Sequence, residues 1–281
     1  MNNLLKSIFI ATFPAFAMII AIDSIIHMIQ NDIGYRYLGR LVSSGTIAFL
    51  FASLFIYKRA RTERNLNLYT IFIALGFLIS FIGGSFVEGN SLLGASMSFI
   101  LLVLWIAYIK WYSEFGERKS ELLKVGNTLP EFTLEDGDKN KVLSSSYLGS
   151  PTIFLFYRGN WCPLCMAQIK EIARQYKELE KRGAKVVLIS PQPHKFTKSL
   201  AKKYDVNFDF LVDVNNTVAK QLGILTKNGI PAGFQLFGYS SDTIMPTVVI
   251  TDKKGKIIFA DLTDNYRVRP EPETFLQVLG Q

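Results

Sequence analysis

The sequence predicts an all-α membrane domain followed by an α/β domain in which a central mixed sheet is flanked by helices. Three observations lead to this prediction. Long apolar runs fill residues 1–112, whereas short apolar segments alternate with charged amphipathic ones in residues 126–281. The two cysteines of the 281-residue chain lie three positions apart, where a strand-like segment gives way to a helix-like one. Residues 113–125 are predicted to link the two domains.

The apolar runs of the first domain are long enough to be membrane spans. A helix needs about 20 mostly apolar residues to cross the hydrocarbon core of a bilayer. Four stretches are predicted to do so: residues 4–26, 41–57, 68–87 and 92–109. Residues 15–17 (Ala-Phe-Ala) resemble a signal-peptidase site, but apolar sequence continues through Ile22, so we expect an uncleaved anchor.

The distribution of Lys and Arg predicts the orientation of these spans, because cytoplasmic loops are enriched in both residues. Residues 58–64 carry four cations, and the segment after the last span carries Lys110, Arg118, Lys119 and Lys124. The loop between the first two spans has only Arg36 and Arg40, and residues 88–91 have none. We therefore expect an integral protein of the inner (cytoplasmic) membrane, with loop 58–65 and the C-terminal domain in the cytoplasm.

Two ionisable residues lie late in the first span. Asp23 and His27 are four positions apart and so share a helix face. Ionisable groups in spans are often functional, for example in proton or quinone sites. Their position near the end of the span instead favours a solvated pair at the interface.

The overall charge does not indicate a nucleic-acid partner. The chain has 31 Lys and Arg against 23 Asp and Glu, a net charge of +8. Residues 1–125 hold 11 cations and 7 anions, which leaves 20 and 16 for the rest, so each part carries +4. No clustered basic helix with interleaved aromatics occurs in the second part. We expect lipid, rather than nucleic acid, to be the partner of the basic residues.

The sequence of the second domain predicts alternating strands and helices. Strands are predicted at residues 131–134, 152–157, 185–190 and 208–212, and a hairpin at 247–251 and 256–260 around the turn 252–255. Helices are predicted at 163–181, 194–204, 214–222 and 271–279. The continuous apolar run 152–157 is typical of a strand buried on both faces. This order predicts a central sheet with helices on both faces.

The sequence Trp161-Cys162-Pro163-Leu164-Cys165 lies between the strand 152–157 and the helix 163–181. A helix N-terminus offers unpaired N–H groups and a partial positive charge, and both favour a thiolate over a thiol. Pro163 suits the first helical position, because its missing N–H is not needed there. The motif therefore predicts a redox dithiol.

Two other interpretations of the cysteine pair are weaker. A zinc site needs four ligands, and the chain has no further cysteine and only His27 and His194. The cysteines could also serve simply as small buried apolar residues. The strand-to-helix context favours thiol chemistry, with neither metal nor bound cofactor.

Four segments of the second domain resemble a known family. They are residues 129–134 (Leu-Pro-Glu-Phe-Thr-Leu), 156–165 (Phe-Tyr-Arg-Gly-Asn-Trp-Cys-Pro-Leu-Cys), 245–250 (Met-Pro-Thr-Val-Val-Ile) and 264–272 (Asp-Asn-Tyr-Arg-Val-Arg-Pro-Glu-Pro). On these segments the domain resembles the peroxiredoxin-like proteins of the alkyl hydroperoxide reductase/thiol-specific antioxidant superfamily. The resemblance covers residues 124–280 and implies a thioredoxin-like fold and an antioxidant thiol activity.

The chain departs from that family at two positions. Cys165 falls where peroxiredoxins place the peroxide-attacking cysteine, and Cys162 falls where they usually carry Thr or Ser. Typical peroxiredoxins also have an Arg close to the position of Pro246, where this chain has a segment that resembles the cis-proline loop of thioredoxins. Arg158 is a candidate for the missing positive charge, although an ordinary structural or surface pairing is an equal alternative.

The resemblance and the helix geometry disagree about which cysteine attacks. Cys162 caps the helix and is expected to be the more exposed, whereas burial should raise the pKa of Cys165. We expect Cys162 to attack disulfides and Cys165 to resolve the mixed disulfide. Toward peroxide the assignment stays open.

The sequence thus predicts a membrane-anchored thiol oxidoreductase that reduces peroxides or disulfides. Cys162 and Cys165 are the expected catalytic residues, supported by Trp161, Arg158, Pro163 and Pro246. A cytoplasmic thiol donor such as thioredoxin would restore the dithiol. The alternative is a redox sensor or scaffold that switches a membrane partner without turnover. The Gly-rich, aromatic segment 223–240 could be a substrate lip, an oligomer contact or a membrane tether.

Overall fold

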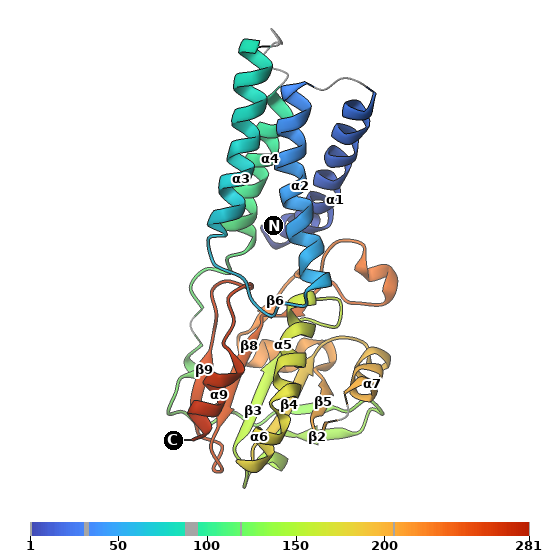
Figure 1. The fold of residues 1–281 in the computed structure, drawn as a ribbon. Helices are drawn as coiled ribbons and strands as arrows, with labels where there is room; N and C mark the ends of the chain where they lie inside the picture. The colour runs from blue at the N-terminus through green and yellow to red at the C-terminus, as the bar shows by residue number, and fades with distance from the viewer. Residues whose placement is uncertain (1, 31–33, 88–94, 119, 205, 281) are drawn as a thin grey trace. The chain divides into compact units, whose positions relative to one another are not determined.

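The computed structural model describes residues 2–30, 34–87, 95–118, 120–204 and 206–280 (Figure 1). The chain forms two compact units. One comprises Ile8–Lys58 and Thr62–Glu114, and the other comprises Phe115–Gln281 with the short segments Met1–Ser7 and Arg59–Arg61. The second unit thus includes most of the predicted linker 113–125.

The N-terminal unit consists of apolar helices. They are α1 (Asn2–Ile29), α2 (Tyr35–Ile56), α3 (Asn67–Leu78) with a π-helical continuation (Ile79–Val87), and α4 (Ser96–Ala107) with a π-helical end (Tyr108–Tyr112). Within the described residues, three are long and apolar enough to cross a membrane: Asn2–Ile29, Tyr35–Ile56 and Asn67–Gly84. The fourth apolar helix, Ser96–Tyr112, is shorter, and residues 88–94, with the start of the predicted span 92–109, lie outside the described residues.

Small residues let α2 and α3 approach closely. A Cβ built on Gly39 would lie 2.3 Å from the carbonyl oxygen of Gly76. The hydroxyl of Ser43 on α2 donates to the carbonyl of Ile73 on α3 (3.0 Å). Such packing of small residues with interhelical hydrogen bonds is typical of helices in membranes. On α1, Asp23 and His27 lie 3.7 Å apart and both side chains are partly exposed.

The C-terminal unit is built on a seven-stranded mixed sheet in the order β2-β1-β5-β4-β3-β8-β9. The strands are β1 (Thr133–Glu135), β2 (Lys141–Leu143), β3 (Thr152–Phe156), β4 (Lys185–Ser190), β5 (Asp209–Val212), β8 (Thr247–Thr251) and β9 (Ile257–Asp261). The strands β3, β4 and β5 are parallel, whereas β8 is antiparallel to β3 and β9. A separate pair is formed by β6 (Leu225–Thr226) and β7 (Thr243–Ile244).

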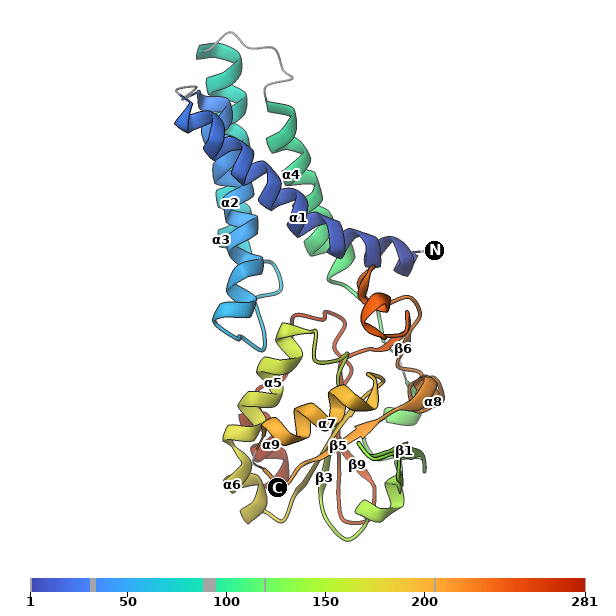
Figure 2. The same cartoon turned by 90° about the vertical axis from the view of Figure 1, so that its right-hand side faces the viewer.

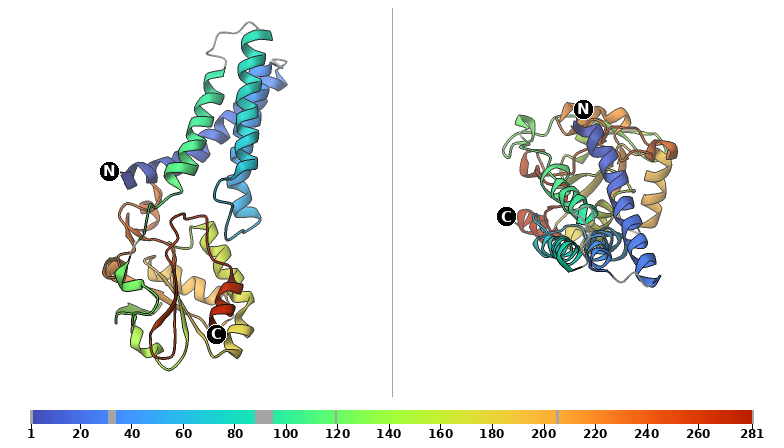
Figure 3. Two further views of the ribbon diagram at one scale, coloured as in Figure 1. Left: turned by 90° about the vertical axis from the view of Figure 1, so that its left-hand side faces the viewer. Right: turned by 90° about the horizontal axis from the view of Figure 1, so that it is seen from above.

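Helices cover both faces of this sheet. On one face, α5 (Pro163–Arg174), α6 (Tyr176–Lys181) and α9 (Pro272–Leu279) lie together (Figures 1 and 3). The amide of Gln175 donates to Glu273 (2.9 Å), which ties α9 to the junction of α5 and α6. On the other face, the short α8 (Thr217–Gln221) packs on the main core. Helix α7 (His194–Lys203), which connects β4 to β5, lies on the α5 face, where Tyr204 at its end stacks on Phe210 (Figure 2).

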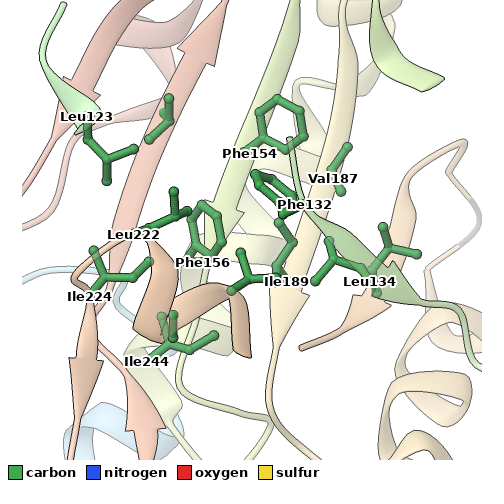
Figure 4. Close-up of a cluster of buried hydrophobic side chains, with 14 of the residues drawn as sticks. Leu123, Phe132, Leu134, Phe154, Phe156, Val187, Ile189, Leu222, Ile224 and Ile244 are labelled. Carbon is green, nitrogen blue, oxygen red and sulfur yellow. The ribbon is translucent and has the colours of Figure 1, made fainter. Parts of the chain in front are cut away.

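The core on the α8 face gathers residues from distant parts of the chain. Phe154 and Phe156 of β3 lie among Phe132, Ile189 and Leu222 (Figure 4). Every residue of β3 is buried, as expected for the central apolar run. Burying a side chain of this size stabilises a fold by roughly 1.5–3 kcal/mol, so this cluster holds the end of β3, and the loop that follows it, in place.

Most predicted elements are present, with differences at their ends. The helix expected over 163–181 is interrupted at Gln175, where ψ is 5° rather than helical. The helix expected over 214–222 begins as a 3₁₀ turn, because Asn215 and Asn216 take left-handed φ values of 57° and 55°. The short strands β2, β6 and β7 are not predicted by the sequence.

Candidate functional site

The dithiol lies at the junction of β3 and α5. The backbone N–H of Tyr157 extends the pairing with β4 by donating to Ile189 O (2.9 Å), and the chain then turns at Gly159, where φ is +147°. A Cβ at Gly159 would lie 2.7 Å from Nε1 of Trp161, so the turn requires glycine. Cys162 follows as the N-cap of α5, and Pro163 is the first helical residue, as the sequence predicts.

Both cysteines are free thiols and both are buried. The Sγ atom of Cys162 accepts a hydrogen bond from the backbone N–H of Cys165 (3.3 Å) and so acts as the helix cap. Cys162 is 3% exposed and Cys165 is 0% exposed. Cys162 is thus the slightly more exposed of the two, but both thiols are buried in this conformation.

The positive charge beside the dithiol comes from Arg269. Its Nη2 donates to Cys165 Sγ (3.4 Å) and lies 3.8 Å from Cys162 Sγ. Its Nη1 donates to Gln168 Oε1 (2.9 Å), and its Nε donates to the carbonyl of Tyr266 (3.1 Å). Sequence reasoning missed Arg269, although it belongs to the segment 264–272 that carries the family resemblance.

This arrangement reverses the expected order of the two pKa values. Burial raises the pKa of Cys165, but the hydrogen bond from Cys162 and the charge of Arg269 outweigh burial and hold that pKa well below its ordinary value. Burial raises the pKa of Cys162, and the pairing with Cys165 raises it further. The helix terminus alone favours the lower pKa at Cys162, whereas the guanidinium of Arg269, which lies nearer to Cys165 Sγ, favours the lower pKa at Cys165.

Of the two roles considered for Arg158, its contacts favour the structural one. Its Nη2 donates to the carbonyl of Gly229, and its guanidinium lies 4.7 Å from the ring centre of Trp161. Its charge also lowers the pKa of Cys162, after the larger influence of Arg269. Arg158 thus joins the loop before Cys162 to a later segment, while Arg269 contacts the sulfurs.

Pro246 lies at the start of β8, whose Thr247 pairs with Phe156 at the end of β3. The carbonyl of Pro246 accepts a hydrogen bond from Arg118 (2.9 Å), and the N–H of Met245 donates to Ile224 O (2.8 Å). The described residues contain no cis peptide bond, so the likeness to a cis-proline loop is wrong for the Met245–Pro246 peptide. The two hydrogen bonds hold this segment as an extended entry to β8.

Fold and site together define a thioredoxin-fold domain with a buried, arginine-bound dithiol at a helix N-terminus. Residues 125–260 match the model of the AhpC/TSA family. The C-terminal unit is therefore a peroxiredoxin-like domain with the thioredoxin fold.

Three curated relatives are similar to this part of the chain. Peroxiredoxin Q, chloroplastic, of Sedum lineare is 36% identical over 99 residues, which are 35% of this chain and 53% of that protein. Peroxiredoxin Bcp of Escherichia coli is 29% identical over 147 residues, 51% of this chain and 90% of that protein. Thiol-disulfide oxidoreductase ResA of Bacillus thuringiensis subsp. konkukian is 22% identical over 141 residues, 50% of this chain and 70% of that protein. The chain spans about half the length of the chloroplastic relatives.

Proposed function

We propose that the protein is a membrane-anchored thiol oxidoreductase in which Cys162 and Cys165 reduce peroxides or disulfides, with peroxides as the preferred class. The observation that carries this proposal is the guanidinium of Arg269 at 3.4 Å from Cys165 Sγ. A cation at this distance favours the thiolate, which is the nucleophilic form. The similarity to peroxiredoxin Q and Bcp supports peroxide, and the similarity to ResA supports disulfides.

The proposed peroxide reaction starts from the Cys165 thiolate, which attacks one oxygen of a hydroperoxide. The O–O bond breaks, an S–O bond forms, and the leaving alkoxide or hydroxide takes a proton, so the products are a Cys165 sulfenic acid and an alcohol or water. Cys162 Sγ then attacks the sulfur of the sulfenic acid. This step forms the Cys162–Cys165 disulfide and releases water.

The same thiolate can attack a disulfide sulfur instead. This attack gives a mixed disulfide and one free substrate thiol, and Cys162 then releases the second substrate thiol. In either case the protein is left with an oxidised pair. A cytoplasmic dithiol donor such as thioredoxin would return the two electrons and two protons, and no bound cofactor is needed.

The apolar N-terminal helices support membrane anchoring. Three are long and apolar enough to cross a membrane, and the basic residues 58–64 favour a cytoplasmic C-terminal domain. We propose the boundaries 1–112 for the membrane domain, 113–125 for the linker and 126–281 for the redox domain, with residues 115–125 of the linker packed in the C-terminal unit. The anchor is tested by washing membrane vesicles with alkaline carbonate, after which the protein should remain in the membrane. Its release by this wash, without detergent, would contradict the proposal.

The catalytic assignment is tested with single Cys→Ser variants of the full chain in detergent. After one equivalent of hydrogen peroxide and trapping of the sulfenic acid, intact mass should show the adduct on Cys162→Ser and none on Cys165→Ser. Rates with hydrogen peroxide and with a model protein disulfide then decide the substrate class. An adduct on Cys165→Ser alone would reverse the assignment, and turnover of disulfides alone would remove the peroxidase function.

The second candidate is a redox sensor that switches a membrane partner without turnover. Its support is the burial of both thiols in a chain that also carries apolar helices. It predicts that oxidation occurs once and that steady turnover equals that of the Cys162→Ser, Cys165→Ser double variant. Turnover well above the double variant would exclude it.

A further inference from the structure

A segment of the C-terminal unit forms an aromatic lip beside the dithiol. We define the lip as residues 229–241. It contains the 3₁₀ turn Phe234–Phe237, flanked by Gly233 and Gly238 with left-handed φ values of 95° and 91°. Its tip is strongly exposed, with Leu236 at 90%. Because only glycine adopts such φ values without strain, the turn is bounded by two positions at which the backbone can rotate.

Three contacts join the lip to the four residues before Cys162. The guanidinium of Arg158 donates to Gly229 O. The ring of Phe234 packs against Trp161 with 5.6 Å between the ring centres. The hydroxyl of Tyr239 donates to Asn160 Oδ1. The lip is therefore attached to the backbone that leads directly into the dithiol.

The contact between Tyr239 and Asn160 is held from both sides. The ring of Tyr239 stacks on Phe196 of α7, with 5.0 Å between centres and 9° between planes. The N–H of Asn160 donates to the buried Gln192 (2.8 Å), whose amide in turn donates to Tyr157 (3.1 Å). Burial raises the pKa of Tyr239 to about 12, above an ordinary value that already keeps the phenol protonated at neutral pH.

The attached lip has different consequences for small and large substrates. In this conformation the two cysteines are 3% and 0% exposed. To attack a protein disulfide, the cysteine sulfur must approach along the line of the S–S bond. The two substrate chains that the disulfide joins are too large to enter the site and must stay outside it. A small hydroperoxide needs room for only two oxygen atoms and a short substituent.

We propose that the lip determines the substrate specificity of the dithiol: it admits small hydroperoxides and excludes protein disulfides, with Tyr239–Asn160 and Phe234–Trp161 among the contacts that keep it in place. This inference rests on the proposed oxidoreductase function. The lip acts by access alone and supplies no group to the chemical steps. On this proposal, the residues of the lip determine whether the protein reduces peroxides or disulfides.

The test compares lip variants of the full chain in detergent. Tyr239→Phe removes the hydroxyl and keeps the ring that stacks on Phe196, and Phe234→Ala removes the ring that packs on Trp161. Leu236→Ala is the matched control, because it shortens an apolar side chain at the exposed tip of the same lip. Each protein is assayed with hydrogen peroxide and with insulin, whose disulfides are the protein substrate.

Loss of a hydrogen bond of this kind changes an equilibrium by a few-fold to about tenfold. We therefore expect Tyr239→Phe to raise the insulin rate by that factor, and Phe234→Ala, which loses an aromatic pair of comparable strength, to raise it by a similar one, each with less than about a twofold change in the peroxide rate. Leu236→Ala should match the wild type on both substrates. An unchanged insulin-to-peroxide ratio in both lip variants, or an equal rise in Leu236→Ala, would overturn the proposal.

Labelling of the thiols provides a readout that does not depend on turnover. The reduced proteins are treated with iodoacetamide, a small reagent, and with a maleimide carried on a bulky polymer. The two lip variants should react faster than wild type with the bulky reagent and at a similar rate with the small one. If no protein turns over either substrate, the proposed function fails, while the labelling ratio still decides whether the lip controls access.

Discussion

At the scale of single residues, Arg269 is the group that we propose makes one of the two thiols the more reactive. It is 104 positions from Cys165 in the sequence, and its guanidinium reaches both sulfurs and Gln168. A helix N-terminus contributes only a partial charge, whereas the guanidinium contributes a full one at hydrogen-bond distance. The sulfur that lies closer to the full charge should therefore be the nucleophile.

Replacing this charge should slow the reaction and change its pH dependence. In Arg269→Met the pKa of Cys165 should rise, so the alkylation rate of the thiol should begin to increase only at higher pH than in wild type. Because a charged hydrogen bond is worth about 1.5–3 kcal/mol, the peroxide rate at neutral pH should fall roughly tenfold to a hundredfold. The measurement is the rate of iodoacetamide alkylation of Cys162→Ser as a function of pH, with and without Arg269→Met.

Two further variants define the cause. Arg269→Lys keeps the charge and loses the planar fork, so it should restore part of the rate. Arg174→Met makes the same change at the exposed end of α5. Its alkylation rate should depend on pH as that of the wild type does. A profile for Arg269→Met that coincides with wild type would show that the guanidinium does not set the reactivity of Cys165.

The site residues that could be predicted from the sequence are those that lie together in one short motif. Cys162, Pro163 and Cys165 follow from one short motif and the rule that a helix begins there. Arg269 could not be placed by spacing, because its contact with the dithiol depends on how the chain returns after β9. The segment 264–272 pointed to it only as a matching stretch, without a role.

At the scale of elements, α5 places three functional side chains in register. Cys162 caps the helix, Cys165 lies three positions later and Gln168 another three, so all lie near one face and meet Arg269. Gln168 is buried and accepts from the guanidinium as a neutral group. The helix thus holds Arg269 without competing for its charge.

This role of Gln168 gives a second prediction. In Gln168→Glu a carboxylate takes the place of the amide, pairs with Arg269 and adds a negative charge near the sulfur. The pKa of Cys165 should rise, and the peroxide rate at neutral pH should fall by about threefold to tenfold.

Lys177→Gln is the control for Gln168→Glu, because it changes the net charge by the same amount at an exposed position on α6. The pH profile of alkylation is again the measurement. A Gln168→Glu protein that reacts like Lys177→Gln would show that the residue serves packing alone.

The elements with the longest apolar segments were the ones that could be predicted from the sequence. The buried strand β3 and the paired strands β8 and β9 have clear patterns and are present. The strands β2, β6 and β7 have two or three residues each, too few for a period to be recognised. Gln175 interrupts a helix whose pattern continues across it. The residues on either side of α6 bond to α9: Gln175 donates to Glu273, and Arg182 donates to Leu276 O.

At the scale of the whole molecule, the chain joins a set of apolar helices to a redox domain. Close packing at Gly39 and Gly76 and the hydroxyl bond between Ser80 and Ser98 (2.8 Å) connect the helices through small and polar groups. This is the chemistry by which helices associate where the surroundings are as apolar as their side chains. The orientation that we propose for these helices is predicted from the distribution of charge in the sequence and not from their packing.

The last prediction concerns this orientation. Residues 58–64 carry four cations, and such loops remain in the cytoplasm. A fluorescent protein fused after residue 281 should therefore be fluorescent, and alkaline phosphatase at the same position should be inactive, because it needs an oxidising compartment for its disulfides. Phosphatase fused after Gln30, between the first two helices, is the control and should be active. The opposite pattern at the two positions would place the redox domain outside the cytoplasm. A cytoplasmic donor such as thioredoxin could not reduce it there.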